Sequence, residues 1–197
     1  MALAKDAQIP KECAYDIFHR LASDNDLQVV ESLLKRDTLP DEHACHILEL
    51  ALVHNDPLLN TLIGERKQIP EDCACDIYTT LSRNYDWRVR ETVASNERIP
   101  QKCACDILVK LASDEDFNVR ERVASNKGIP EQCGCYIFEN LATDKDIDIH
   151  RLVASNPTIP ERCAKDILGK LLSEEEEFPV REAVKSNPLY KRLFEKT

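Results

Sequence analysis

Cysteine is the residue type in this sequence whose spacing first suggests chemistry. The chain has 197 residues and nine cysteines. Each stands either three or five residues after a proline, so the cysteines fall into two positions of a recurring Cys-x-Cys pattern. The first position holds Cys13, Cys73, Cys103, Cys133 and Cys163, and the second holds Cys45, Cys75, Cys105 and Cys135.

If each Cys-x-Cys lies on a helix, its two side chains point about 200° apart and cannot chelate one metal ion. Equivalent cysteines on stacked helices would lie roughly 10 Å apart, which is too far for a shared ion. The two positions instead flank an apolar stripe, one facing the preceding helix and one the following helix. If the second position faces forward, Tyr15 meets His43 and Cys13 is left over. The cysteine neighbours are then Cys45 and Cys73, Cys75 and Cys103, Cys105 and Cys133, and Cys135 and Cys163.

Three interpretations of these neighbours remain open. A reducing cytosol favours thiols that pack as small apolar side chains. A ladder of disulfides between successive helices requires Cα separations below about 7 Å. Metal binding or redox sensing is the third.

Other catalytic patterns are absent from the sequence. It has no Gly-rich phosphate loop and no H-E-x-x-H, G-x-S-x-G or C-x-x-C. The five histidines are scattered, although His43 and His46 share a helix face and form either a weak metal pair or a packed pair. We therefore expect no enzyme, no cofactor and no metal site.

The elements that position these residues are repeats. Prolines recur every 30 residues, at Pro10, Pro40, Pro70, Pro100, Pro130 and Pro160, with similar text behind each. The proline suits the first turn of a helix, and Ala104, Ile107, Leu108 and Leu111 then recur at helical spacing. Either Asp114 or Asp116 can cap a second helix, which we expect from about Phe117 to Ser125, with Asn126 as a left-handed stop.

One such helix pair cannot bury its own apolar face, whereas stacked pairs can. The sequence therefore predicts an all-α fold, an α-solenoid of six two-helix repeats in a single repeat domain, 1–197. Its predicted parts are a partial unit at 1–9, repeats at 10–39, 40–69, 70–99, 100–129, 130–159 and 160–188, and a C-terminal cap at 189–197.

The string D-x-D-x-x-V-R-x-x-V-A, from Asp114 to Ala124, resembles the core of a HEAT-type repeat. The pattern VR-x-x-VA-x-N-P-x-x-P, in degenerate form from Ile149 to Pro160, is similar to the leucine-rich repeat variant family, whose repeat is about one helical turn shorter. The resemblance covers nearly the whole chain. It implies a right-handed superhelix that binds other macromolecules.

In HEAT-like repeats, rows of Arg and Asp pair between neighbouring repeats. The corresponding row here is Arg90, Arg120, His150 and Arg181, with Asp114 and Asp144 in the turns. A half-buried Arg normally needs a carboxylate partner, so we expect this row to be structural. The alternative is that it binds an anionic partner.

The same resemblance places the second helices on the concave face. The outward positions that we select as a binding strip are Leu58, Leu62, Arg88, Glu91, Arg122, Arg151 and Leu152. This strip mixes both charges with leucine and is no basic groove, which disfavours nucleic acid. Local repacking of Leu58 and Leu62 is the alternative to a contact.

Whole-chain composition narrows the function. The net charge of −10 repels phosphate backbones, and no apolar run is long enough for a membrane span. Without a secretory apolar segment at its start, the chain is predicted to be cytoplasmic. We expect a non-catalytic scaffold for a protein partner. The alternatives are a HEAT-like nucleic-acid binder or DNA glycosylase, and a thiol-based redox-responsive scaffold.

Overall fold

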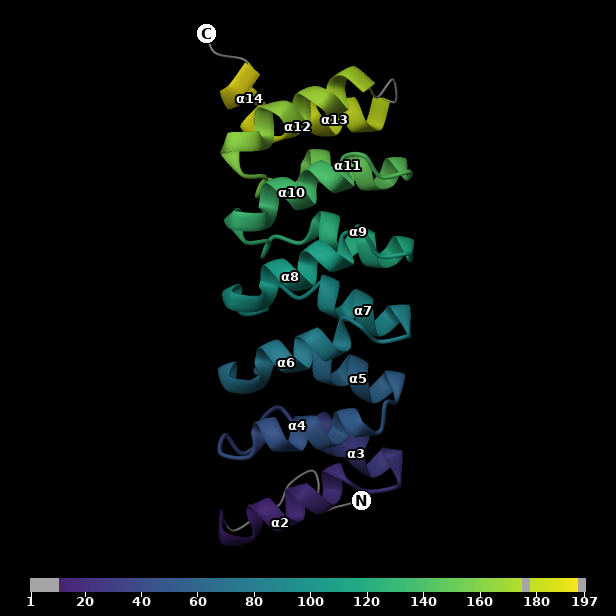
Figure 1. Ribbon diagram of the computed structural model, residues 1–197, viewed down its shortest axis with the longest axis vertical. Coiled ribbons are helices and arrows are strands. Elements are labelled where there is room, and N and C mark those ends of the chain that lie inside the picture. Colours follow the sequence, from purple (N-terminus) through teal and green to yellow (C-terminus); the bar gives the residue numbers. More distant parts are fainter. Residues whose placement is uncertain (1–10, 175–177, 195–197) are drawn as a thin grey trace. The chain divides into compact units, whose positions relative to one another are not determined.

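The computed structural model describes residues 11–174 and 178–194. Regular structure in these residues is entirely helical, in thirteen helices, and the prediction of an all-α fold is confirmed (Figure 1). Within the same residues, no helix combines the length and the apolar character needed to cross a membrane. The predicted partial unit at 1–9 lies outside the described residues.

The chain divides into two compact units, residues 1–93 and 94–197. We describe each unit by itself. The predicted grouping of all repeats into a single domain stays a prediction.

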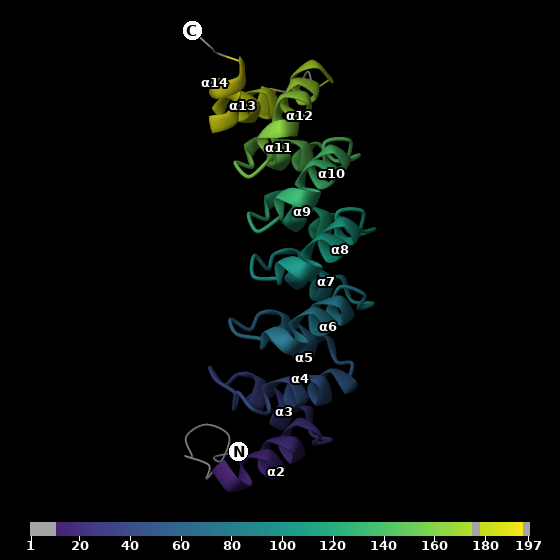
Figure 2. The same cartoon turned by 60° about the vertical axis from the view of Figure 1, so that its left-hand side comes forward.

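Unit 1 contains two layers of helices. Helices α2 (Lys11–Ala22), α4 (Ala44–Val53) and α6 (Glu71–Leu81) lie side by side, and α3 (Leu27–Leu34) and α5 (Pro57–Gly64) form the second layer (Figure 2). Helix α7 (Trp87–Ala94) lies on the same side as α3 and α5, in the second layer, and ends at the division between the units (Figure 2). The layers meet over a core that includes Leu33, Ile47, Leu48, Ile63 and Ile77, all of them fully buried.

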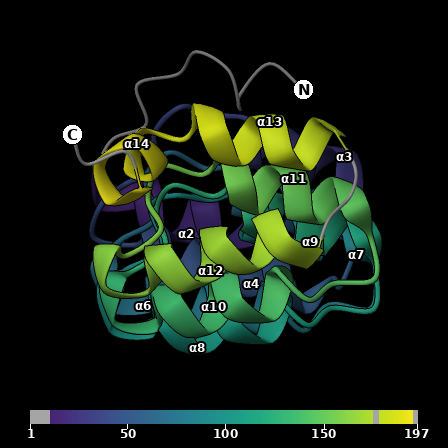
Figure 3. The ribbon, with the colours of Figure 1, turned by 90° about the horizontal axis from the view of Figure 1, so that it is seen from above.

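Unit 2 has the same construction. The first layer, which corresponds to α2, α4 and α6 of unit 1, consists of α8 (Gln101–Leu111), α10 (Glu131–Leu141) and α12 (Glu161–Glu174). Helices α9 (Phe117–Ser125), α11 (Ile147–Ser155) and α13 (Phe178–Ser186) form the other (Figure 3), and α14 (Pro188–Phe194) packs against α12 and α13. Val119, Ile137, Phe138, Leu141 and Val153 are completely buried between the layers.

Helix starts follow the predicted residues with one shift. Pro100 and Pro130 are N-caps rather than first-turn residues, and the Pro100 carbonyl accepts from the N–H groups of Cys103 and Ala104. At the start of α9, Asp114 and Asp116 both accept hydrogen bonds from backbone N–H groups. Asp116 Oδ1 accepts from Asn118 N at 2.8 Å, and Asp114 Oδ1 accepts from Asp116 N at 3.0 Å. The predicted bounds of α9 are confirmed.

The prediction of a left-handed stop at Asn126 is wrong. Its backbone is extended, with φ −68° and ψ 130°, and Asn156 has φ −74° and ψ 118°. These values allow any residue type, so backbone conformation does not explain why asparagine recurs there. The explanation is a side-chain contact, described below.

Candidate functional site

Disulfides join neighbouring helices of the first layer in both units. Cys45 of α4 is bonded to Cys73 of α6 in unit 1. In unit 2, Cys105 of α8 is bonded to Cys133 of α10, and Cys135 of α10 to Cys163 of α12. The Cα atoms of each pair are 5.7 or 5.8 Å apart, inside the range for a disulfide.

These bonds differ from the favoured expectation of reduced thiols. The pairing direction, by contrast, agrees with the forward one, because the bonds join three of the four expected neighbour pairs. The physical reason is that non-equivalent positions face each other across the helix contact, closer than the roughly 10 Å between helix axes. Cys75 and Cys103 lie in different units, so their pairing stays a prediction.

The first contact of the series has aromatic rings in place of cysteines. The ring of Tyr15 lies 4.9 Å from that of His43, centroid to centroid, as the forward direction predicts, and Cys13 is free and exposed. His46 also stacks on Tyr15, at 5.8 Å, and lies 5.4 Å from the ring of His19. His43 and His46 are therefore packed against a tyrosine. Among the described residues, no group of three His, Cys, Asp or Glu side chains is placed to hold a metal ion.

The arginine row is structural at the positions where its contacts are resolved. Arg120 is buried, and its Nε and Nη2 donate to Asp144 Oδ2 and Oδ1 at 2.6 and 3.2 Å. Its Nη1 donates to the carbonyls of Asp114 and Glu115. These bonds to Asp144 raise the pKa of Arg120 above the ordinary arginine value. The pair links α9 to the turn before α11 in the next repeat.

Other members of the row make related contacts, with one exception. Arg90 is buried and donates to the carbonyls of Asn84 and Tyr85. The ring Nε2 of His150 lies 2.7 Å from the Asp144 carbonyl. Arg181 is exposed, which differs from the prediction of a half-buried structural residue. It follows the one-residue insertion in the last repeat.

An asparagine ladder runs through unit 2. Asn156 Nδ2 donates to the carbonyls of Ala124 and Asn126 at 2.9 and 3.1 Å, and its Oδ1 accepts from Thr158 N. Asn126 and Asn187 make the corresponding bonds to the preceding repeat. All three asparagines are buried. Sequence reasoning missed this role, although the strict recurrence of Asn at one position was a signal for it.

In unit 1, arginine takes the place of asparagine at the same repeat position. Arg66 Nη1 donates to the carbonyls of Leu34 and Arg36 at 2.6 and 3.1 Å, the acceptors that correspond to those of the ladder. Its Nε atom is buried without a hydrogen bond. Burial lowers the pKa of Arg66, and the negative charge of Asp37 opposes that shift.

The predicted binding strip is divided between the two units. In unit 1, Leu58 is 54% exposed on α5 and Leu62 is half-buried beside it. On α7, Glu91 is half-buried and Arg88 is exposed. Arg88 donates to both carboxylate oxygens of Asp86, and these bonds lower the pKa of Asp86 and raise that of Arg88.

In unit 2, the strip residues lie on α9 and α11. Arg122 and Arg151 are exposed and Leu152 is half-buried. Arg151 has Asp148 as an ion-pair partner at 3.5 Å, a distance and exposure at which the pair adds little stability. Each unit thus presents its own part of the strip on second-layer helices.

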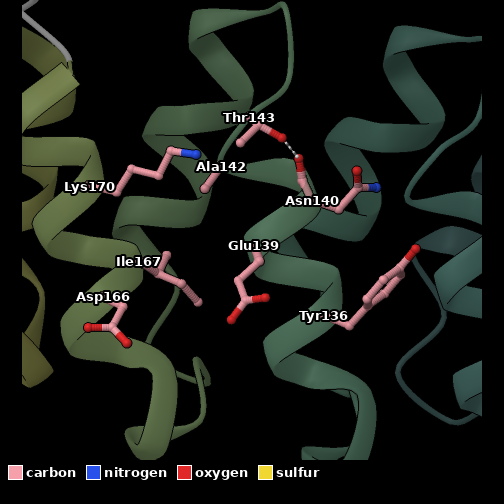
Figure 4. Close-up of a pocket in the computed structure, with 8 residues that line it drawn as sticks. All are labelled: Tyr136, Glu139, Asn140, Ala142, Thr143, Asp166, Ile167 and Lys170. Atoms are coloured by element: carbon pink, nitrogen blue, oxygen red, sulfur yellow. Dashed lines mark hydrogen bonds between the residues drawn. The ribbon is translucent and has the colours of Figure 1, made fainter.

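A groove of about 450 Å³ lies on the opposite layer of unit 2, between α10 and α12 (Figure 4). Glu139 and Tyr136 come from α10, and Asp166 and Lys170 come from α12. Thr143 Oγ1 donates to the Asn140 carbonyl at its rim. The lining residues include no histidine, cysteine or serine, so the groove offers no nucleophile–base pair of those types.

Comparison with known proteins does not assign this chain to a family. No known family profile matches the sequence, and no curated protein matches it either.

Proposed function

We propose that this chain is a non-catalytic repeat scaffold that binds a protein partner through the outward positions of its second-layer helices. We further propose that its two-helix repeats, six in number, form a right-handed α-solenoid of the HEAT-like kind, closest to the leucine-rich repeat variant family.

The observation that carries this proposal is a contrast between the two sides of the second-layer helices. The inward side is nearly uniform, since Val89, Val119 and Ile149 are all fully buried at one repeat position, and Val93, Val123 and Val153 at another. The outward side varies more, although Ser95, Ser125 and Ser155 recur at one exposed position. One outward position holds Leu58, Arg88, Asn118 and Asp148 in successive repeats, and another holds Leu62, Thr92, Arg122 and Leu152.

Packing between repeats requires similar residue types at the inward positions of these helices, but it does not constrain the residue types at the outward positions. A scaffold can therefore carry a different contact on each repeat without loss of stability. Exposed leucines on such a surface favour a protein contact. The mixed charges and the net charge of −10 argue against the alternative of a nucleic-acid binder or glycosylase.

Photo-cross-linking tests the proposed face. A photoreactive amino acid in place of Leu58 or Arg122 is expected to capture one discrete protein in lysate of the source cell. The same group in place of Lys102 or Arg162, exposed on the first layer, is the matched control and is expected to capture none. Capture through the first layer alone would reject the second-layer face.

The disulfides support a second candidate, the redox-responsive scaffold. They join successive first-layer helices, so reduction would loosen the stack. Disulfides are typical of oxidising compartments, whereas the cytoplasmic location stays a prediction under which the cysteines would be reduced thiols. Alkylation of free thiols in intact cells, followed by mass spectrometry, separates these cases. Alkylation of Cys105 and Cys133 would support a cytoplasmic, reduced state, and protection would support an oxidising compartment.

A further inference from the structure

Unit 1 contains a cavity of about 600 Å³ at the C-terminal ends of α3 and α5, which we call the Arg66 pocket. Four cationic residues line it, namely Lys35, Arg36, Arg66 and Lys67, against two anionic ones, Asp37 and Glu65. Lys35 also contacts Glu31 of its own helix. The balance is positive, in a chain whose net charge is −10.

The pocket sits where unit 1 departs from the asparagine ladder. Positions 96, 126, 156 and 187 are Asn, whereas the corresponding positions 36 and 66 are Arg. Asparagine already satisfies the two backbone carbonyls in unit 2. Arg66 donates to the corresponding carbonyls of unit 1 with Nη1 alone. It also adds a positive charge and further N–H donors, and the packing of unit 2 shows that neither is needed for this contact.

Arg66 is also desolvated. It is half-buried, its Nε atom is buried without a hydrogen bond, and its Nη2 makes no hydrogen bond to a described residue. Nε is out of reach of a ligand, whereas Nη2 is not among the buried unpaired atoms and can donate to an incoming anion. A partly buried cation is stabilised by such an anion, and a carboxylate is a suitable acceptor for a guanidinium N–H.

The remaining lining residues favour a peptide over a polyphosphate chain. Leu62 provides apolar surface beside the cations, and Thr38 and Gln68 are exposed polar residues that can bond to a peptide backbone. Asp37 and Glu65 would repel closely spaced phosphates, while a peptide can direct its N–H groups to them.

We infer that the Arg66 pocket binds an acidic peptide segment of a protein partner, with a carboxylate on Arg66 and Lys67 and an aliphatic side chain on Leu62. Leu62 belongs to the proposed binding strip, so this inference rests on the proposed function. It adds the chemistry of the partner and the residue that anchors it.

Arg66→Asn is the decisive variant, because Asn at the corresponding positions of unit 2 makes the same two carbonyl contacts. The fold is therefore expected to persist while the charge is lost. Lys67→Glu is a second variant at an exposed position, in case Arg66→Asn unfolds. Lys127→Ala, at the repeat position of Lys67 but in unit 2, is the control.

The probe is a short fluorescein-labelled peptide of glutamates around one central leucine, followed by fluorescence anisotropy with the full chain. We expect binding to weaken about tenfold in Arg66→Asn and in Lys67→Glu, because each loses a charge-assisted contact. Lys127→Ala is expected to bind like the native chain. Rising salt should weaken all of them.

Absence of peptide binding, or equal binding by native chain and Arg66→Asn, would overturn the inference. So would a labelled single-stranded oligonucleotide that binds the pocket more tightly than the peptide does. Cross-linking through Arg122 separates the two proposals. If it still captures a protein while the peptide fails, only the acidic-peptide inference is wrong, and if both fail, the proposed function is wrong too.

Discussion

At the scale of single residues, side-chain contacts with backbone carbonyls connect successive repeats within each unit. In unit 2 the donors are asparagines, and in unit 1 Arg66 donates to the corresponding acceptors. The arginine row adds a buried ion pair between Arg120 and Asp144, whose side chains are 6% and 8% exposed. Removing one partner from such a contact leaves a buried polar group unsatisfied, which costs more than the contact contributes.

Substitution of Asn156 tests the ladder directly. Asn156→Ala removes two donated bonds and the acceptor of Thr158 N, all in a buried position. We expect the free energy of unfolding to fall by about 2–3 kcal/mol. Urea denaturation measures it, with Ser155→Ala, an exposed neighbour, as a control that should change little. Equal effects of the two substitutions would show that the ladder adds no stability.

At the scale of helices, sequence reasoning succeeded where local chemistry decides the outcome. The bounds of α9 follow from the Asp116 cap and the apolar spacing behind it. The facing cysteine positions follow from angles around a helix, which Cys105 and Cys133 illustrate. The role of Asn126 did not follow, because its acceptors lie 30 and 32 residues away and depend on how repeats stack. The exposure of Arg181, which comes after the one-residue insertion of the last repeat, did not follow from the repeat pattern either.

The start of α7 makes stability depend on pH. Hydrogen bonds from Arg88 lower the pKa of Asp86 below the ordinary aspartate value of 3.8. A depressed folded pKa contributes stability above the unfolded pKa and loses it as pH falls through the folded value. Asp86→Asn keeps an acceptor for the Arg88 N–H but not the charge. In denaturation between neutral and acidic pH, the native chain should keep its full advantage over this variant above about pH 4 and lose it as the pH falls through the lowered pKa of Asp86. A difference that stays constant with pH would contradict this.

The disulfides connect helices that are far apart in sequence. Cys135 and Cys163 are 28 residues apart along the chain, and a cross-link of that span adds about 3–4 kcal/mol by restricting the unfolded chain. The double variant Cys135→Ser with Cys163→Ser should lose that amount in non-reducing denaturation. Cys13→Ser, at the free cysteine, should lose nothing measurable. Nine titratable thiols in the denatured, unreduced native chain would contradict the cross-links.

At the scale of the whole molecule, the two compact units share one construction and differ in what they expose. Unit 1 carries the leucines of α5 and the cationic Arg66 pocket, and unit 2 carries Arg122 and Arg151 on adjacent second-layer helices. The inward residues of the second-layer helices in unit 2 repeat with little change, as Val123 and Val153 illustrate. We therefore propose that binding involves the outward positions, where packing allows the chain to differ from repeat to repeat.

Affinity capture from lysate of the source cell, at low and at high salt, tests this central claim most directly. The bait is the full chain, beside a strip variant that combines Leu58→Asp with Arg151→Glu, both at exposed positions. We predict that the native chain retains a discrete protein at high salt and that the strip variant loses it. Recovery of nucleic acid that high salt removes, or equal capture by both baits, would contradict the account.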